Sequence, residues 1–216
     1  MTSNTRKPIF FTSDWHLGHD KALQFDERPF RDMAHQIEVL ITRFNATVPE
    51  NGVTYFLGDM GFKPAGIKEV MDKLNGVKVL ILGNHDRNMN SMYNAGFDVV
   101  QHGAVLNIQG QRVSLSHCPL LDVYREDTSV MLAYKEVMPG SSPPWHGNDR
   151  AVHRSLSTVD NGQFHLHGHI HSRKERAQSK KIEGRQYDVG VTANNYTPVS
   201  ISQIESWIAN HVRTRK

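Results

Sequence analysis

The chain has 216 residues, of which 38% are hydrophobic and 22% are charged. This length and composition are typical of a globular protein with a sizeable core, and we expect residues 1–216 to form a single domain. No apolar run is long enough to cross a membrane, so no membrane partner is expected. The formal net charge of +3 is compatible with a phosphate-bearing substrate but is too small to indicate extended nucleic-acid binding.

Cysteine usage and the first residues suggest a location. Cys118 is the only cysteine, so an internal disulfide is impossible and we expect a reducing, cytoplasmic compartment. Residues 1–7 lack the apolar core of a signal peptide, which agrees with that expectation. A nucleophilic role for Cys118 is not favoured, because nothing nearby in the sequence marks an acidic thiol.

The first half of the chain alternates predicted strands and helices. Apolar runs predict strands at 8–13, 53–57 and 77–82, and helical spacing of apolar residues predicts amphipathic helices at 32–46 and 64–74. Strand–helix–strand order implies parallel strands with right-handed crossovers. Sheets of this kind bind ligands beyond the carboxyl ends of their strands.

Polar side chains follow each of these three strands. Asp14 and His16 follow the first, Asp59 follows the second, and Gly83-Asn84-His85-Asp86 follows the third. Carboxylate, amide and imidazole groups are metal ligands, and an imidazole can also move a proton. Because the three strand ends share one edge of the sheet, we expect these groups to converge there.

The second half predicts shorter strands. They fall at about 97–100, 104–109 and 112–116, with a hairpin turn at Gly110, and later at 163–167 and 187–191. His117 follows one of these strands, and Gly168-His169-Ile170-His171 follows another. We expect His165 and His167, inside a strand, to be either packing groups or groups that contact and orient the metal ligands. Ser200 and Gln203 predict a capping box for a C-terminal helix.

Three further features allow two readings each. His19 and Arg28 fit loop hydrogen bonding better than phosphate contact. Residues 120–155 carry loop signals, and this insertion could be a lid or a surface excursion. The basic segment 173–185 fits a solvated hairpin better than a nucleic-acid patch.

The ordered set of strand-end motifs resembles the calcineurin-like metallophosphoesterases. The motifs are Asp14-x-His16, Gly58-Asp59, Gly83-Asn84-His85-Asp86, His117 and Gly168-His169-x-His171. Further stretches are similar to a group of small, uncharacterised bacterial and phage phosphoesterases: Phe11-Thr12-Ser13-Asp14, Gly18-His19, Arg28-Pro29-Phe30, Asp188-Val189-Gly190-Val191 and Asn194-Asn195-Tyr196-Thr197-Pro198-Val199-Ser200.

The resemblance implies a four-layer αββα sandwich with two divalent metal ions at the sheet edges. Carried over residue by residue, it implies that one ion is held by Asp14, His16, Asp59 and His171, and the other by Asp59, Asn84, His117 and His169. Asp59 would bridge the two ions. Nitrogen and oxygen ligands without sulfur fit manganese, iron, zinc, cobalt or nickel, so the sequence leaves the identity of the metal open.

The resemblance also assigns roles in catalysis. A water activated by the two ions would attack phosphorus, and His85 would protonate the leaving oxygen as a general acid. Protein Ser/Thr phosphatases of this superfamily carry an acid three residues after the bridging Asp, where this chain has Phe62. We therefore discount a protein-phosphatase role. Asp86 is a catalytic candidate that could orient His85 instead.

These features predict a phosphodiesterase or phosphatase that acts on small, nucleotide-like phosphoesters. The candidate substrate-binding residues are His19, Arg28 and Asn84. A metal-dependent nuclease is the alternative, prompted by the basic segment 173–185, although nucleic acid is not the favoured partner. A non-catalytic binding module on the same fold is a third hypothesis, but such modules usually lose ligands or the catalytic His, and this chain keeps all of them.

Overall fold

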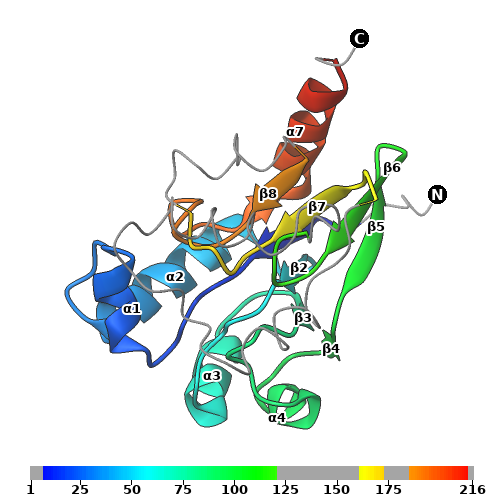
Figure 1. The fold of residues 1–216 in the computed structure, drawn as a ribbon. Helices are drawn as coiled ribbons and strands as arrows, with labels where there is room; N and C mark the ends of the chain where they lie inside the picture. Colours follow the sequence, from blue (N-terminus) through cyan, green and yellow to red (C-terminus); the bar gives the residue numbers. More distant parts are fainter. Residues whose placement is uncertain (1–6, 121–160, 173–184, 214–216) are drawn as a thin grey trace, which may run out of the picture.

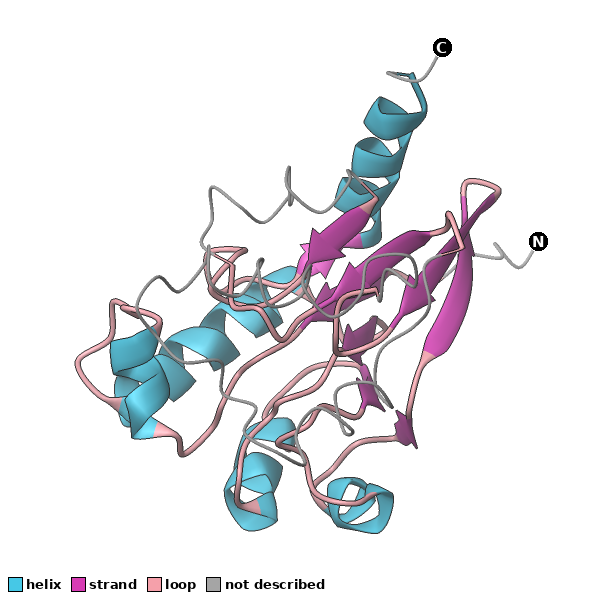
Figure 2. Ribbon diagram, viewed as in Figure 1, coloured by secondary structure: helices cyan, strands magenta, loops and turns pink. Residues whose placement is uncertain are grey.

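The computed structural model describes residues 7–120, 161–172 and 185–213. Beyond Leu120, the predicted insertion at 120–155 lies outside the described residues, and so does the basic segment up to residue 184. The described part forms two sheets flanked by helices, and Figures 1 and 2 show the two groups of strands lying side by side. The predicted mixed α/β sandwich with two sheets is therefore confirmed.

The first sheet has five strands in the order β4-β3-β2-β1-β9. Its parallel strands are β1 (Ile9–Thr12), β2 (Val53–Phe56), β3 (Val77–Ile81) and β4 (Val99–Gln101), and β9 (Val199–Ser200) runs antiparallel beside β1. The parallel arrangement predicted for the first three strands is confirmed, so their carboxyl ends share one edge of the sheet.

Helices α2 (Met33–Thr47), α3 (Pro64–Met71) and α4 (Met89–Asn94) cover one face of this sheet. Their apolar stripes bury Phe44, Ile67 and Met92 in one cluster with Phe56 and Leu80 of the strands. Burying a side chain of this size contributes roughly 1.5–3 kcal/mol, so the cluster fixes the helices against the sheet.

The second sheet has the order β5-β6-β7-β8. A hairpin joins β5 (Ala104–Ile108) to β6 (Gln111–Leu115), and β7 (Phe164–His167) and β8 (Gln186–Asp188) continue the sheet in parallel with β6. Gln109 and Gly110 both have positive φ, as a two-residue hairpin turn requires. The predicted turn at Gly110 is confirmed.

The two sheets share an apolar interior. Phe11, Leu57 and Ile81 of the first sheet lie in one cluster with Leu115 and Leu166 of the second. This contact fixes the carboxyl ends of β1, β2 and β3 relative to those of β6 and β7, and the predicted site depends on that arrangement.

Helix α7 (Ile201–Arg213) completes the second apolar cluster. Its Trp207 ring packs edge-on against Phe164 and Tyr187 of the second sheet. The capping box at its start is confirmed, because the Ser200 N–H donates to Gln203 Oε1 at 2.8 Å and the Gln203 N–H donates to Ser200 Oγ at 3.3 Å.

Three short elements differ from the sequence prediction. Helix α1 (Asp20–Phe25), helix α4 and strand β9 are not predicted by the pattern, and each has only two to six residues. The strand predicted at 187–191 ends early, at Asp188. Within the described ranges, no helix is both long and apolar enough to span a membrane.

Candidate metal centre

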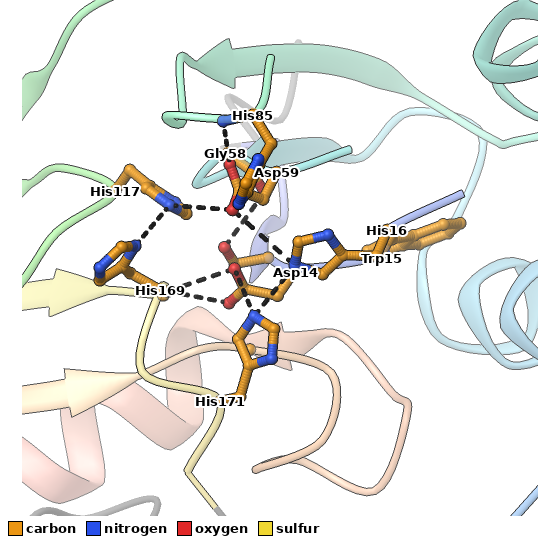
Figure 3. Close-up of polar contacts among 12 residues, drawn as sticks. Asp14, Trp15, His16, Gly58, Asp59, His85, His117, His169 and His171 are labelled. Atoms are coloured by element: carbon orange, nitrogen blue, oxygen red, sulfur yellow. Dashed lines mark hydrogen bonds and ion pairs between the residues drawn. The ribbon is translucent and has the colours of Figure 1, made fainter. Parts of the chain in front are cut away.

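The predicted ligands converge in loops that follow five strands. Figure 3 shows most of them pointing toward one another, from the loops after β1, β2, β6 and β7. They form two groups that could each hold a metal ion, and within each group the ligand atoms lie within 4.8 Å of one another. The first group is Asp14, His16 and His171, and the second is Asp59, His117 and His169.

In the first group, ring nitrogens and a carboxylate face one point. His16 Nε2 lies 3.0 Å from His171 Nε2, and His171 Nε2 lies 3.6 Å from Asp14 Oδ1. Asp14 is almost fully buried and also accepts the backbone N–H of His169. This backbone contact joins the loop after β1 to the loop after β7.

In the second group, Asn84 is placed with the histidines. Its Oδ1 lies 2.9 Å from His117 Nε2 and 3.0 Å from His169 Nδ1. His117 Nδ1 lies 2.7 Å from the Leu57 carbonyl oxygen, to which it can only donate. That bond leaves Nε2 of a neutral His117 free to act as a ligand.

Asp59 belongs to the second group and also faces the first. Its Oδ2 is 3.7 Å from His16 Nε2 and 3.3 Å from His117 Nε2. Its Oδ1 accepts the backbone N–H of His85 at 2.9 Å, which fixes the direction of the carboxylate. This position is the one that the proposed bridging role requires.

The backbone of these loops is strained at the ligands themselves. Five of the nine described non-glycine residues with positive φ are candidate ligands: Asp14, His16, Asp59, His169 and His171. A left-handed conformation at such residues costs about 1–3 kcal/mol each, and clusters of this strain occur at functional sites.

A glycine allows two of these loops to approach closely. A Cβ on Gly168 would lie 2.5 Å from Asp14 Oδ2 and 2.7 Å from Ser13 Cβ, so only glycine fits at that position. The glycine of the predicted motif Gly168-His169-x-His171 therefore has a steric cause.

In the metal-free site, the acidic and imidazole side chains shift one another's pKa values. Burial alone would raise the pKa of Asp14, but the hydrogen bond and charge of His171 lower it to about 2. Burial would likewise raise the pKa of Asp59, but His117 holds it well below its usual value. In return, and against its own burial, the charge of Asp59 raises the pKa of His117 to about 9. Ionised carboxylates and buried imidazoles suit divalent cations, which would replace the protons.

His85 is exposed and lies beside the first ligand group. Its ring lies 5.7 Å from the His16 ring and 5.6 Å from the Phe62 ring, measured between centroids. Phe62 also packs edge-on against His19 at 4.8 Å. An aromatic contact therefore occupies the place where the protein phosphatases carry an acid.

Asp86 does not have the geometry of a partner for the His85 ring. Its carboxylate accepts the backbone N–H groups of Asp59, Met60 and Gly83 at 2.8–3.0 Å. Burial and the nearby charge of Asp59 raise its pKa to about 6. These contacts indicate that Asp86 positions the loops after β2 and β3, rather than orienting His85.

Arg28 is buried, and all five of its N–H donors have acceptors. They contact the Asp26 carboxylate, the carbonyl oxygens of Asp14 and Trp15, and Gln36 Oε1. No donor is left for a phosphate, so the loop-bonding reading fits Arg28 and the substrate-binding reading does not. His19 is half-buried beside His16, and Asn84 lies among the ligands.

Sequence reasoning missed Asp26. Its Oδ1 lies 2.9 Å from Nδ1 of His171, a predicted ligand. In the sequence, Asp26 is only an Asp two residues before Arg28. Nothing in that pattern indicates that this loop folds back against the first ligand group.

The comparisons with known proteins agree with this geometry. The model of the calcineurin-like phosphoesterase family matches residues 7–173. The Gene 66 protein of Mycobacterium phage D29 is 29% identical over 202 residues, which cover 86% of this chain and 88% of the phage protein. The uncharacterized protein MJ1445 of Methanocaldococcus jannaschii is 33% identical over 84 residues, 38% of this chain, and the match spans 48% of that protein.

A solved structure supports the fold. The protein of unknown function AQ665 from Aquifex aeolicus superposes with a TM-score of 0.65 at 22% identity, covering 93% of this chain and 99% of that one. The family model extends over the loops that carry Asp14, Asp59, Asn84, His117, His169 and His171. The chain belongs to the calcineurin-like phosphoesterase family.

Proposed function

We propose that the protein is a metal-dependent hydrolase of phosphate esters, and that its substrates are small and nucleotide-like. One observation carries the proposal. Two ligand groups meet at the Asp59 carboxylate, and a histidine outside both groups, His85, lies beside them. A site that only stored metal would have no need of this extra imidazole.

The residues divide the chemistry between them. Two divalent ions, when bound, would supply an activated water and polarise the phosphoryl oxygens. The residues in the two groups would hold the ions: Asp14, His16 and His171, and Asn84, His117 and His169, with Asp59 shared. His85 would give a proton to the leaving oxygen, since it is exposed and its ring lies beside that of the ligand His16.

The aromatic groups at the rim support a nucleotide-like substrate. Phe62 is half-buried, and its ring contacts both His19 and His85. A leaving group protonated by His85 would therefore lie near Phe62. A nucleobase presents a flat ring, and stacking of a base on an aromatic side chain is worth about 1–3 kcal/mol.

A metal-dependent substrate panel tests the proposal. Purified protein would be assayed with Mn²⁺, and with a chelator, on cyclic nucleotides, dinucleotides, nucleoside monophosphates, p-nitrophenyl esters, a phosphoprotein, DNA and RNA. We expect metal-dependent turnover of small phosphoesters. Activity confined to phosphoproteins, or no turnover when two ions are bound, would overturn the proposal. Cleavage of long DNA or RNA alone would establish the nuclease alternative.

A matched pair of variants tests the substrate class. Phe62→Ala should raise KM for nucleotides about tenfold, since 1.4 kcal/mol of lost stacking is a factor of ten, and should barely change KM for glycerophosphate. Phe25→Ala removes an aromatic ring that is 60% exposed on α1 and should change neither value. Equal effects of Phe62→Ala on both substrates would contradict base stacking.

A further inference from the structure

Asp26 and Arg28 form a buried unit beneath the first ligand group. The Arg28 guanidinium contacts Asp26 Oδ2 through Nε at 2.9 Å and through a terminal nitrogen at 2.7 Å. The side chains are 0% and 3% exposed. A bidentate pair of this kind is rigid as well as strong, so each partner fixes the other.

The unit touches the first ligand group at two points. Asp26 Oδ1 lies 2.9 Å from His171 Nδ1, and Arg28 donates to the backbone carbonyl of Asp14 at 2.9 Å. Arg28 also reaches the carbonyl of Trp15, between the ligands Asp14 and His16. One ion pair thus contacts the loops after β1 and β7, which supply all three ligands of this group.

The contact with Asp26 determines which nitrogen of His171 is available. A carboxylate only accepts, so Nδ1 carries the proton and Nε2 faces His16 and Asp14. In the second group, His117 is fixed in the same way by an uncharged acceptor, the Leu57 carbonyl. The two groups therefore differ, because Nδ1 of His171 contacts a carboxylate, whereas Nδ1 of His117 contacts a neutral carbonyl oxygen.

The local chain explains how Asp26 reaches this position. Helix α1 ends at Phe25, and Asp26 remains bonded to it through its N–H, which donates to the Ala22 carbonyl. Glu27 adopts a positive φ and reverses the chain, and the Arg28 N–H donates back to the Leu23 carbonyl. The turn places Asp26 and Arg28 on the same inner side.

We propose that Asp26 is a positioning residue that, held by Arg28, aims His171 Nε2 at the metal ion bound by Asp14, His16 and His171. Removal of such a partner typically weakens metal binding 10–100-fold. The inference rests on the proposed two-metal function, so its test measures metal binding and not turnover.

The experiment compares Asp26→Asn with Asp20→Asn, which changes an exposed acid at the start of α1, the helix that Asp26 follows. Mn²⁺ would be titrated into metal-free protein by calorimetry, and the loaded samples examined by electron paramagnetic resonance. The wild type and Asp20→Asn should bind two ions and give the spectrum of a coupled pair. Asp26→Asn should bind one ion normally and the other about 10–100-fold more weakly, with the six-line spectrum of a single ion at limiting Mn²⁺.

Several outcomes separate the inference from its alternatives. In a His171→Ala background, Asp26→Asn should cause no further loss of affinity, because the two residues act as one unit. Wild-type affinity for both ions in Asp26→Asn, or an equal loss at both sites, would overturn the inference. Asp26→Glu, which keeps a carboxylate, should retain part of the Mn²⁺ affinity that Asp26→Asn loses. If the effect of Asp26→Asn were purely structural, the variant would instead have a lower thermal stability without metal. Absence of metal from the wild type would overturn the proposed function itself.

Discussion

Among single residues, His85 can be tested without removing a metal ligand. If it is the general acid, its importance should depend on how much the leaving group needs a proton. Nitrophenolate leaves readily without one, whereas a ribose alkoxide does not. General acid catalysis is typically worth about 10²–10⁴-fold.

His85→Ala should therefore slow hydrolysis of a nucleoside ester by about 10²–10⁴-fold and that of a p-nitrophenyl ester by clearly less. Steady-state kinetics on both substrates, with metal analysis of the purified variant, would check this. Equal losses with both metals retained would indicate stabilisation of transition-state charge instead. Loss of a metal would mean that His85 is a ligand.

Position 168 requires glycine, because a side chain there would collide with the loop after β1. A Cβ there would meet Asp14 Oδ2 and Ser13 Cβ within 2.7 Å. Gly168→Ala should destabilise the fold by about 1–3 kcal/mol, as overpacking does, and should weaken metal binding by displacing Asp14.

Gly66 is the matched control for that substitution. It lies in α3, with no atom within 4 Å of an added Cβ. Gly66→Ala should stabilise the protein by about 0.5–1 kcal/mol, the usual helix preference of Ala over Gly. Urea unfolding of both variants would check the pair, and a wild-type stability for Gly168→Ala would show that the two loops can separate freely.

At the scale of elements, Asp86 joins the loops after β2 and β3. Its Oδ2 accepts the N–H groups of Asp59 and Gly83, and its Oδ1 accepts that of Met60. Each unpaired buried N–H costs about 1–3 kcal/mol, so Asp86→Ala should lower the free energy of unfolding by about 2 kcal/mol or more.

The free energy of unfolding of Asp86→Asn should lie between those of the wild type and Asp86→Ala, because an amide oxygen in the Oδ2 position keeps two of the three hydrogen bonds. Urea denaturation of metal-free protein would rank the three chains. If Asp86→Ala keeps wild-type stability but loses as much activity as His85→Ala does, then Asp86 acts through His85. The role of Asp86 in positioning the loops after β2 and β3 would then be wrong.

The elements also show what the sequence can predict. The sequences of β1, β2 and β3 are continuous apolar runs, and α2 carries a wide apolar stripe on its inward face. The pattern of hydrophobic residues alone is therefore enough to predict these elements. Helices α1 and α4 have six residues each, and β9 has two. Such short elements are stabilised by tertiary packing rather than by their own pattern. Asp26 lies at the end of α1, and it was missed together with that helix.

At the scale of the whole molecule, the ligands come from both sheets. Asp14, Asp59 and Asn84 follow strands of the first sheet, and His117 and His169 follow strands of the second. The sequence could name these residues from their motifs. It could not show that apolar packing between the sheets brings the two sets of loops together. Bound metal ions would therefore link the sheets, and their binding energy would add to the stability of the fold.

Metal binding should also be coupled to proton release. Although burial alone would lower the pKa of His117, the charge of Asp59 raises it to about 9. Asp26 likewise raises the pKa of His171 well above its ordinary value, against the effect of burial. Both shifts favour protonated imidazoles in the metal-free protein, and an imidazole must become neutral to bind a cation.

The sign of the pH dependence follows. Below pH 9, raising the pH removes protons that compete with the metal, so Mn²⁺ affinity should rise with pH, by up to about tenfold per unit for each proton released. Calorimetry in buffers of different ionisation enthalpy, between pH 6.5 and 8.5, would count the protons. His102→Gln, which removes an exposed imidazole outside the site, should leave the count unchanged. Affinity independent of pH across this range, with no proton released, would show that His117 and His171 are already neutral in the metal-free protein, and that the charges of Asp59 and Asp26 do not raise their pKa values.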